Sequence, residues 1–329
     1  MDLTEFKLNL FNLQTLNEFN ETALHLFRYQ YTNNSIYKRF VDALGIHAEK
    51  VFCLDQIPFL PVSFFKTHEI RTGNFPAELI FESSGTTGME NSKHYVADAG
   101  LYQQSFTKGL KLFYGDLSKY AVFALLPSYL ERKNSSLVYM VEKILLQSNR
   151  QMGGFYLNEL ENLKDHLLEA QRVGLNIMLF GVTFALLDMV EKWPVKIPGA
   201  VIVETGGMKG RREEITRMEL HEKLCNGFGV EKIHSEYGMT ELLSQAWSAG
   251  DGIFRCPPWM KIRIADTNDP LSYLETGRTG GINIIDLANI HSCSFIATQD
   301  LGRVFEDGSF EVLGRFDNSD IRGCSLLAT

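Results

Sequence analysis

The chain has 329 residues, of which 45% are hydrophobic and 22% charged, and its formal net charge is −8. This length and composition are typical of a folded globular protein with a large core, and they exclude an intrinsically disordered chain. The acidic balance, without any dense cluster of Lys and Arg, argues against nucleic acid as a partner.

No stretch approaches the roughly 20 apolar residues of a membrane span, and the acidic N-terminal segment is not typical of a signal peptide. The five cysteines are an odd number, widely spaced and without a CxxC pair. This pattern fits neither a disulfide framework nor a zinc site. We therefore expect a reduced, cytoplasmic setting.

Residues 1–50 are expected to be mostly helical, and the prolines of 57–70 predict an extended segment. The apolar stretch 78–82 is expected to be a strand that runs into the sequence SSGTTG at 83–88. Further along, the apolar run 120–129 predicts a strand, and 134–148 has capping residues followed by helical spacing.

The alternation of strands and helices continues through the middle of the chain. Leu157, Leu160, Leu163 and Leu167 make one helix face, and 176–190 indicates a strand, a turn near Gly181 and a helix. Residues 199–207 predict a buried strand that runs into a glycine turn, with a charged helix from about Arg211 to Cys225. Short apolar strands flanked by helices favour an α/β body with a largely parallel sheet.

After about residue 250 the pattern changes to that of antiparallel strands. Met260, Ile262 and Ile264 alternate with Lys261 and Arg263, as in a half-buried strand. We therefore expect two parts, an α/β body at 1–250 and a β-rich subdomain at 251–329 that ends in a tail with Cys324.

The loop SSGTTG combines hydroxyls with glycines directly after a strand. Gly85 and Gly88 allow positive φ, so that successive N–H groups can point into one concavity that suits phosphate oxygens. Hydroxyl donors come from Ser83, Ser84, Thr86 and Thr87, and Lys93 follows nearby. The ending of a Walker A loop is missing, and a plain Ser/Gly-rich turn is an equal alternative for this loop alone.

Three later motifs add hydroxyls, aromatics and charges: EYGMTE at 236–241, TQDLG at 298–302 and GRFD at 314–317. Taken singly, each is also compatible with a surface turn. Lone histidines such as His234 and His291 are more often structural than catalytic, so we leave both out of the catalytic set.

In this order, the four motifs resemble those of the adenylate-forming superfamily of acyl-CoA synthetases, luciferases and adenylation domains. IPFLPVSFFK at 57–66 and RGCSLL at 322–327 narrow the resemblance to the LuxE-type acyl-protein synthetases, over nearly the whole chain. The resemblance implies the large-domain fold of that superfamily. It also implies formation of an acyl-adenylate from ATP and a fatty or other carboxylic acid, followed by attack of a thiol that releases AMP.

The resemblance also implies roles for single residues. The loop Ser83–Gly88 would hold the β- and γ-phosphates with help from Lys93, and Glu241 would bind Mg²⁺. Thr240 would bond the α-phosphate, and Asp300 would accept bonds from the ribose hydroxyls with Arg315 nearby. The adenine side would be formed by Tyr237, Gly238, Gly206 and Gly207, although a simple strand-to-helix turn is nearly as good an interpretation of the last two.

Most members of the superfamily continue past the GRxD motif into a mobile domain that carries a catalytic lysine, whereas this sequence ends 12 residues after Asp317. We therefore expect the fold to lack that domain. The charge of the lysine would come from Lys93, Lys209 or a partner protein. The family's acylated cysteine corresponds to Cys324, whose neighbour Arg322 would lower the thiol pKa.

Three functions remain open at this stage. The first is acyl transfer through Cys324 to a reductase or other acceptor. The second is a ligase whose acceptor is coenzyme A or a carrier protein. The third is a nucleotide-binding partner subunit without catalysis. The sequence does not indicate the chain length or head-group of the acid, the final acceptor or the oligomeric state.

Overall fold

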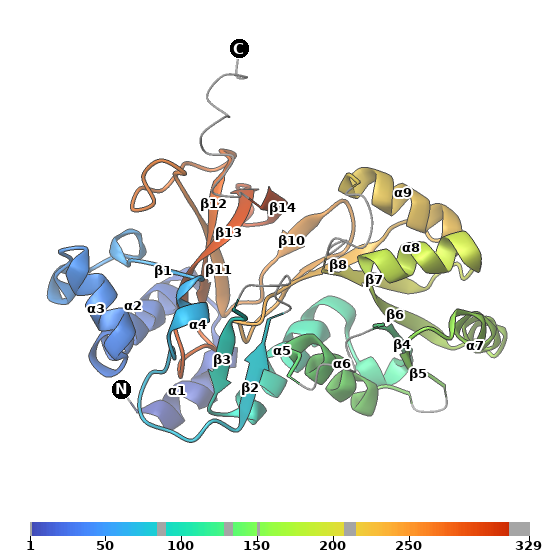
Figure 1. Ribbon diagram of the computed structural model, residues 1–329, viewed down its shortest axis with the longest axis horizontal. Helices are drawn as coiled ribbons and strands as arrows, with labels where there is room; N and C mark the ends of the chain where they lie inside the picture. Colours follow the sequence, from blue (N-terminus) through green and yellow to red (C-terminus); the bar gives the residue numbers. More distant parts are fainter. Residues whose placement is uncertain (1, 84–89, 128–133, 150–151, 207–214, 316–329) are drawn as a thin grey trace, which may run out of the picture. The chain divides into compact units, whose positions relative to one another are not determined.

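The computed structural model describes residues 2–83, 90–127, 134–149, 152–206 and 215–315 (Figure 1). The chain divides into two compact units, and neither is one continuous piece of sequence. The first unit comprises Met1–Tyr102, Glu241–Ser244 and Arg255–Thr329, and the second comprises Gln103–Thr240 and Gln245–Phe254. The units therefore follow a different division from the one expected at residues 250 and 251, because the β-rich segment clusters with the N-terminal helices.

The first unit begins with helices, as the sequence predicts for residues 1–50. They are α1 (Leu3–Asn9), α2 (Leu16–Asn33) and α3 (Ser35–Ala43), with short 3₁₀ turns at Leu10–Asn12, Ala48–Lys50 and Leu54–Gln56. Helix α2 starts at a capping box, in which Thr15 and Glu18 each accept from the other's backbone N–H. The predicted extended segment contains β1 (Leu60–Pro61) and one helical turn, α4 (Phe64–Thr67).

Four antiparallel neighbours make the sheet of the first unit, in the order β11 (Met260–Ala265), β12 (Gly280–Asp286), β13 (Phe295–Val304) and β14 (Phe310–Arg315). Strand β1 pairs in parallel with β13. Met260, Ile262 and Ile264 are buried in β11, which confirms the predicted alternation. A separate hairpin is formed by β2 (Leu79–Glu82) and β3 (Lys93–Val96).

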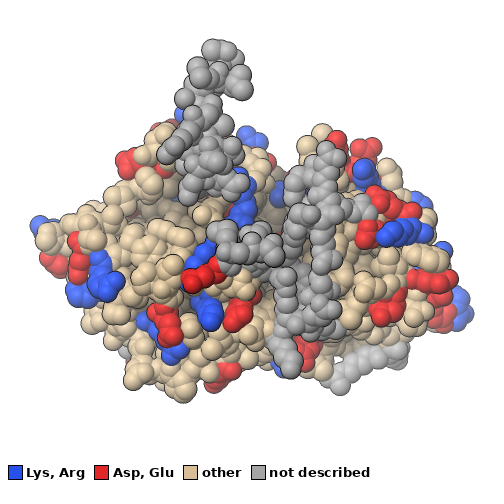
Figure 2. All heavy atoms as spheres, in the orientation of Figure 1, with Lys and Arg blue, Asp and Glu red and all other residues tan. Residues whose placement is uncertain are grey.

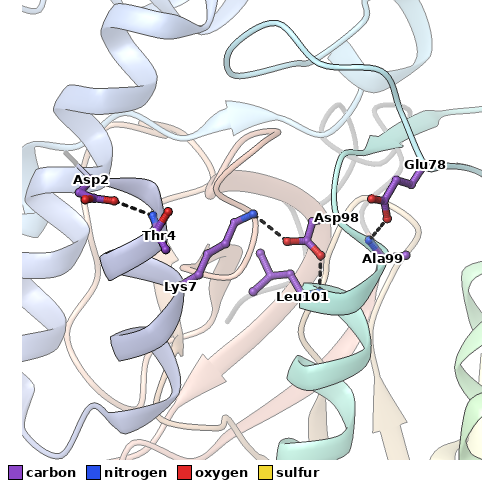
Figure 3. A network of polar contacts seen from close by, with 7 residues as sticks. All are labelled: Asp2, Thr4, Lys7, Glu78, Asp98, Ala99 and Leu101. Carbon is purple, nitrogen blue, oxygen red and sulfur yellow. Dashed lines mark hydrogen bonds and ion pairs between the residues drawn. The ribbon is translucent and has the colours of Figure 1, made fainter.

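Polar contacts fix the N-terminal ends of α1 and α5 (Ala99–Tyr114) (Figure 3). Asp2 accepts from the Thr4 N–H at 2.8 Å. Lys7 Nζ lies 2.7 Å from Asp98 Oδ2, while Asp98 Oδ1 accepts from the Leu101 N–H at 2.9 Å. Asp98 therefore neutralises a lysine of α1 and satisfies one of the free N–H groups at the start of α5.

The second unit is an α/β layer. Its strands lie in the order β10, β9, β8, β7, β6, β4, β5, with bounds β4 (Tyr120–Leu125), β5 (Gly154–Tyr156), β6 (Asn176–Val182), β7 (Val201–Thr205), β8 (His234–Tyr237), β9 (Ala246–Ser248) and β10 (Ile253–Arg255). The pairings from β5 to β8 are parallel, and β9 runs antiparallel to β8. Strands β4 and β6 are buried on both faces, as parallel strands covered by helices are.

The helices of this unit are α6 (Ser136–Gln147), α7 (Leu160–Arg172), α8 (Thr183–Lys192) and α9 (Arg217–Phe228), together with most of α5 and a 3₁₀ turn at Leu117–Lys119. Figure 1 shows α8 and α9 side by side on one face of the strands and α5 and α6 on the other. Leu163 and Leu167 are buried in α7, as the leucine spacing predicts, whereas Leu157 lies before the helix begins. Together these elements confirm the predicted α/β body with a largely parallel sheet.

The change from strand to helix expected near Gly181 falls between Val182 and Thr183, and Gly181 itself is not the turning residue. It lies inside β6, and a Cβ added there would come within 2.4 Å of Leu186 Cδ2. The glycine is therefore required by the close approach of α8 to the strand, whereas the strand continues to Val182 before the helix begins.

The surface shown in Figure 2 carries basic and acidic side chains in mixed order over its described part. None of the described helices combines the length and the apolar content that a bilayer crossing needs.

Candidate active site

The hairpin β2–β3 carries the loop predicted to hold phosphates. Glu82 pairs with Lys93 at the open end of the hairpin. Beyond this pair, the Ser83 N–H donates to the Ser92 carbonyl at 3.1 Å, and the Ser92 N–H donates to Ser83 Oγ at 2.9 Å. The two ends of the loop are therefore fixed to each other. Its predicted phosphate ligands Ser84, Gly85, Thr86, Thr87 and Gly88 lie outside the described residues.

Glu241 is a buried carboxylate in the first unit, with 5% of its surface exposed. Burial raises its pKa above the ordinary value, while a hydrogen bond from the Ser92 side chain and the positive charges of Arg315 and Lys66 favour the ionised form. The backbone carbonyl of Glu241 accepts from Asn289 Nδ2 at 2.7 Å. The same serine thus bonds Ser83, at the start of the predicted phosphate loop, and the Glu241 side chain.

Asp300 and Arg315 lie opposite each other on β13 and β14. Arg315 Nε is 3.6 Å from Asp300 Oδ1, and Arg315 Nη2 donates to Gln299 Oε1 at 3.2 Å. The Asp300 N–H donates to Thr298 Oγ1 at 3.0 Å, which orients this part of the strand. The structure therefore brings Asp300 to Arg315, as the sequence predicts.

Four predicted residues thus belong to one connected group in the first unit. Ser83 is hydrogen-bonded to Ser92, which in turn bonds the Glu241 side chain. The positive charge of Arg315 favours the ionised form of Glu241, and the same guanidinium lies beside Asp300. Lys93 lies at the start of β3, next to Ser92, with its side chain exposed. A hydroxyl, two carboxylates and positive charge gathered in this way are what a nucleotide phosphate and its counter-ion require.

The second unit holds the motif residues around Tyr237, at the end of β8. The Tyr237 ring packs against Phe254, with 5.8 Å between the ring centroids. Beside it, Glu236 Oε2 accepts from Thr205 Oγ1 at 2.6 Å. A Cβ at Gly238 would lie 2.4 Å from Glu236 Oε1, so only glycine fits there without a shift of that carboxylate.

The predicted glycine turn follows β7 in the same unit. Gly206 has a φ of +71°, and its carbonyl accepts from Thr183 Oγ1 at 3.0 Å. Gly207 and Lys209 lie outside the described residues. Thr240 is the last residue of this unit before the chain enters the first unit at Glu241. The two neighbouring motif residues Thr240 and Glu241 are therefore held by different units.

Sequence reasoning missed Ser92 and Asn289, which touch Glu241. Neither is part of a recognisable motif, and their contacts join positions that are far apart in the chain. The only signal for Ser92 is its place just after the predicted loop.

His234 and His291, which lie outside the predicted catalytic set, are both partly buried. Burial lowers the pKa of His234 and of His291 to about 4. Both rings are therefore neutral at physiological pH.

Four of the five cysteines lie in the described part of the chain. Burial raises the pKa of Cys225, Cys256 and Cys293, which disfavours the thiolate, and Cys53 is exposed. Cys324 lies outside the described residues. In the same described part, no group of three or more His, Cys, Asp or Glu side chains is placed to hold a metal ion by itself.

Comparisons with known proteins identify relatives of this chain. The family model of acyl-protein synthetases, LuxE, matches residues 7–329. The chain is 25% identical to the long-chain-fatty-acid–luciferin-component ligase of Vibrio harveyi, over 91% of this chain and 84% of that protein.

Solved structures of adenylate-forming ligases share the fold. An open conformation of 2-hydroxyisobutyryl-CoA ligase, in complex with 2-HIB-AMP and CoA, superposes with a TM-score of 0.70 at 11% identity, over 92% of this chain and 70% of that one. ATP-bound MatB from Rhodopseudomonas palustris gives 0.54 at 17% identity over 74% of this chain. The chain spans 49% of the length of that MatB.

Proposed function

The chain belongs to the LuxE acyl-protein synthetase family, and we propose that it activates a fatty or other carboxylic acid with ATP and transfers the acyl group to a protein thiol. In the first half-reaction, a carboxylate oxygen bonds to the α-phosphorus of ATP while the bond to the leaving pyrophosphate breaks. In the second, a thiolate sulfur bonds to the acyl carbon and the bond to AMP breaks. The products are a thioester and AMP, and the thiol proton passes to water.

The group around Glu241 is the observation that supports adenylation most directly. ATP brings several negative charges, so its site needs hydrogen-bond donors and positive charge close together. Ser83 stands at the start of the phosphate loop, and Arg315 and Lys66 both act on Glu241. Asp300 beside Arg315 offers an acceptor for the ribose hydroxyls.

Glu241 also fits a magnesium ion bound together with ATP. Mg²⁺ in such sites takes one or two protein carboxylates and fills its other positions with phosphate oxygens and water. A single buried carboxylate, already hydrogen-bonded by Ser92, suits that donor set. The bound ion would neutralise charge on the phosphates.

Within the proposed site, Tyr237 would stack on adenine with Gly238, Gly206 and Gly207 along its edge. Thr240 would donate to the α-phosphate, and Lys93 would supply charge near the phosphates. The loop Ser83–Gly88 would hold the β- and γ-phosphates through its N–H groups.

Cys324 is the proposed acyl acceptor, and the acyl group would pass from it to a reductase or another acceptor protein. The name of the Vibrio harveyi relative supports a long-chain fatty acid as substrate. Two alternatives predict different results. A ligase that uses coenzyme A or a carrier protein would not need Cys324, and a partner subunit without catalysis would bind ATP but not exchange pyrophosphate.

The test is to incubate the protein with ATP, Mg²⁺ and a panel of radiolabelled fatty acids. The wild type should catalyse ATP–pyrophosphate exchange and acquire label that hydroxylamine removes, as it does from a thioester. Cys324→Ser should keep exchange and lose the label. Cys53→Ser is the matched control because Cys53 is an exposed free cysteine, and it should retain both activities.

Label that persists in Cys324→Ser would exclude this residue as the acceptor. Formation of acyl-CoA by that variant would favour the ligase alternative. ATP binding without exchange for every acid tested would favour the partner subunit.

A further inference from the structure

A buried turn after β12 contacts the backbone of the segment Glu241–Ser244. Asp286 Oδ2 accepts from the N–H groups of Leu243 and Ser244, at 2.8 and 3.0 Å. Its other oxygen accepts from Ser244 Oγ at 2.6 Å and from the Ala288 N–H at 3.1 Å. Asp286 has no exposed surface. Its two carboxylate oxygens accept hydrogen bonds from this segment and from its own turn.

Asn289 contacts the residue that matters most for the proposed site. Its Nδ2 donates to the Glu241 carbonyl at 2.7 Å and to the Cys293 carbonyl at 2.9 Å. Its Oδ1 lies 3.0 Å from His94 Nε2. Because Oδ1 can only accept, this contact places a proton on His94 Nε2. Asn289 is fully buried, and both ends of its side-chain amide are hydrogen-bonded by these three contacts.

Strand β3 and the residue just before it therefore support Glu241 in two ways. Ser92 bonds the Glu241 side chain, and His94 holds the amide that bonds the Glu241 carbonyl. Ser83 at the start of the predicted phosphate loop, Glu241 and the turn at 286–289 are consequently linked through hydrogen bonds that are buried or partly buried.

We propose that Asn289 and Asp286, with His94 behind Asn289, are positioning residues that hold Glu241 where it can bind the metal of the nucleotide. This inference rests on the proposed function, because it assigns a purpose to the support of Glu241. Buried hydrogen bonds that fix a ligand from behind commonly set metal affinity in proteins. A purely structural turn would affect the stability of the fold without a specific effect on metal binding.

Asn289→Asp is the sharpest perturbation. It keeps the size of the side chain and the oxygen that faces His94, but it replaces the donor to Glu241 with an oxygen that repels the carbonyl. Asn34→Asp is the matched control. Asn34 is buried in the same unit, and its Nδ2 donates to the Ser292 carbonyl at 3.1 Å without contacting Glu241.

ATP binding by calorimetry, with Mg²⁺ and with EDTA, gives a readout that does not depend on catalysis. Loss of one buried hydrogen bond corresponds to about a tenfold change in an equilibrium constant. Asn289→Asp should therefore weaken ATP binding about tenfold or more with Mg²⁺, and much less with EDTA. Asn34→Asp should leave both affinities near those of the wild type, even where it lowers the urea midpoint.

Equal weakening with Mg²⁺ and with EDTA, or an unchanged affinity in both, would overturn the proposal. If Asn289→Asp does not fold, Ser244→Ala removes the hydroxyl bond to Asp286 and should weaken ATP binding with Mg²⁺ but not with EDTA, by a smaller factor. Failure of the proposed function looks different, because the wild type itself would then show no Mg²⁺-dependent ATP binding.

Discussion

The Ser92 hydroxyl is predicted to set the charge state of Glu241, and Ser92→Ala tests this directly. Burial raises the pKa of Glu241, and the bond from Ser92 opposes that effect. A hydrogen bond to a charged acceptor is worth about 1.5–3 kcal/mol, or a factor of about 10 to 150 in an equilibrium constant. The variant should therefore bind Mg²⁺·ATP weaker by a factor in this range, and its Glu241 should hold a proton to higher pH.

The assay is ATP–pyrophosphate exchange as a function of pH and of Mg²⁺ concentration. In Ser92→Ala, the acidic limb of the pH profile should move to higher pH, and half-saturation should need more Mg²⁺. Ser309→Ala is the control, since this buried serine of the same unit also bonds a carboxylate, that of Asp307, away from Glu241. A pH profile and a Mg²⁺ requirement equal to those of the wild type would refute the reasoning.

Three further predictions concern stability. Glu241→Gln should raise the free energy of unfolding at neutral pH and abolish pyrophosphate exchange. The pKa of Glu241 is raised in the folded state, so its ionised form destabilises the fold at neutral pH. A lower urea midpoint than that of the wild type would contradict this. Asp98→Ala should lower the free energy of unfolding by about 1–2 kcal/mol, and Lys7→Met should lower it by less than about 1 kcal/mol. The difference arises because Asp98 also accepts a hydrogen bond from the first turn of α5. Equal losses in urea titrations would show that the ion pair dominates. His234→Gln and His291→Gln should each reduce the loss of unfolding free energy between pH 6.5 and about 4. In this range the unfolded chain takes up a proton on the histidine that the folded chain does not. If urea titrations show the same dependence of unfolding free energy on pH as the wild type, the rings are not buried in neutral form.

Local pattern was sufficient for most elements of the fold. The apolar stretch before SSGTTG is β2, the run from Tyr120 is β4, and the alternation from Met260 is β11. Each of these depends on residues close together in sequence, where the spacing of apolar side chains follows the local geometry. Gly181 shows the limit of this reasoning, because its role depends on the contact with Leu186.

The sequence predicts the candidate site as a set of residues and does not predict how their side chains are arranged. The motifs indicated Glu241, Asp300 and Arg315. The structure places all three in the first unit, whereas the expected division at residues 250 and 251 separates Glu241 from the other two. Asp300 and Arg315 lie opposite each other on β13 and β14. The raised pKa of Glu241 and its support by Asn289 depend on contacts across tens to hundreds of residues. Such contacts leave no periodic trace in a single sequence.

The passage of the chain between units within one motif has a consequence for protein engineering. Glu241–Ser244 belongs to the first unit, although Thr240 before it and Gln245 after it belong to the second. No single cut in the gene separates the two units, so neither can be expressed as an uninterrupted fragment. A chimera that exchanges one unit with a relative must carry this four-residue insert along with the segments containing Asp286 and Asn289. A crossover placed within the motif would otherwise pair Glu241 with a foreign support.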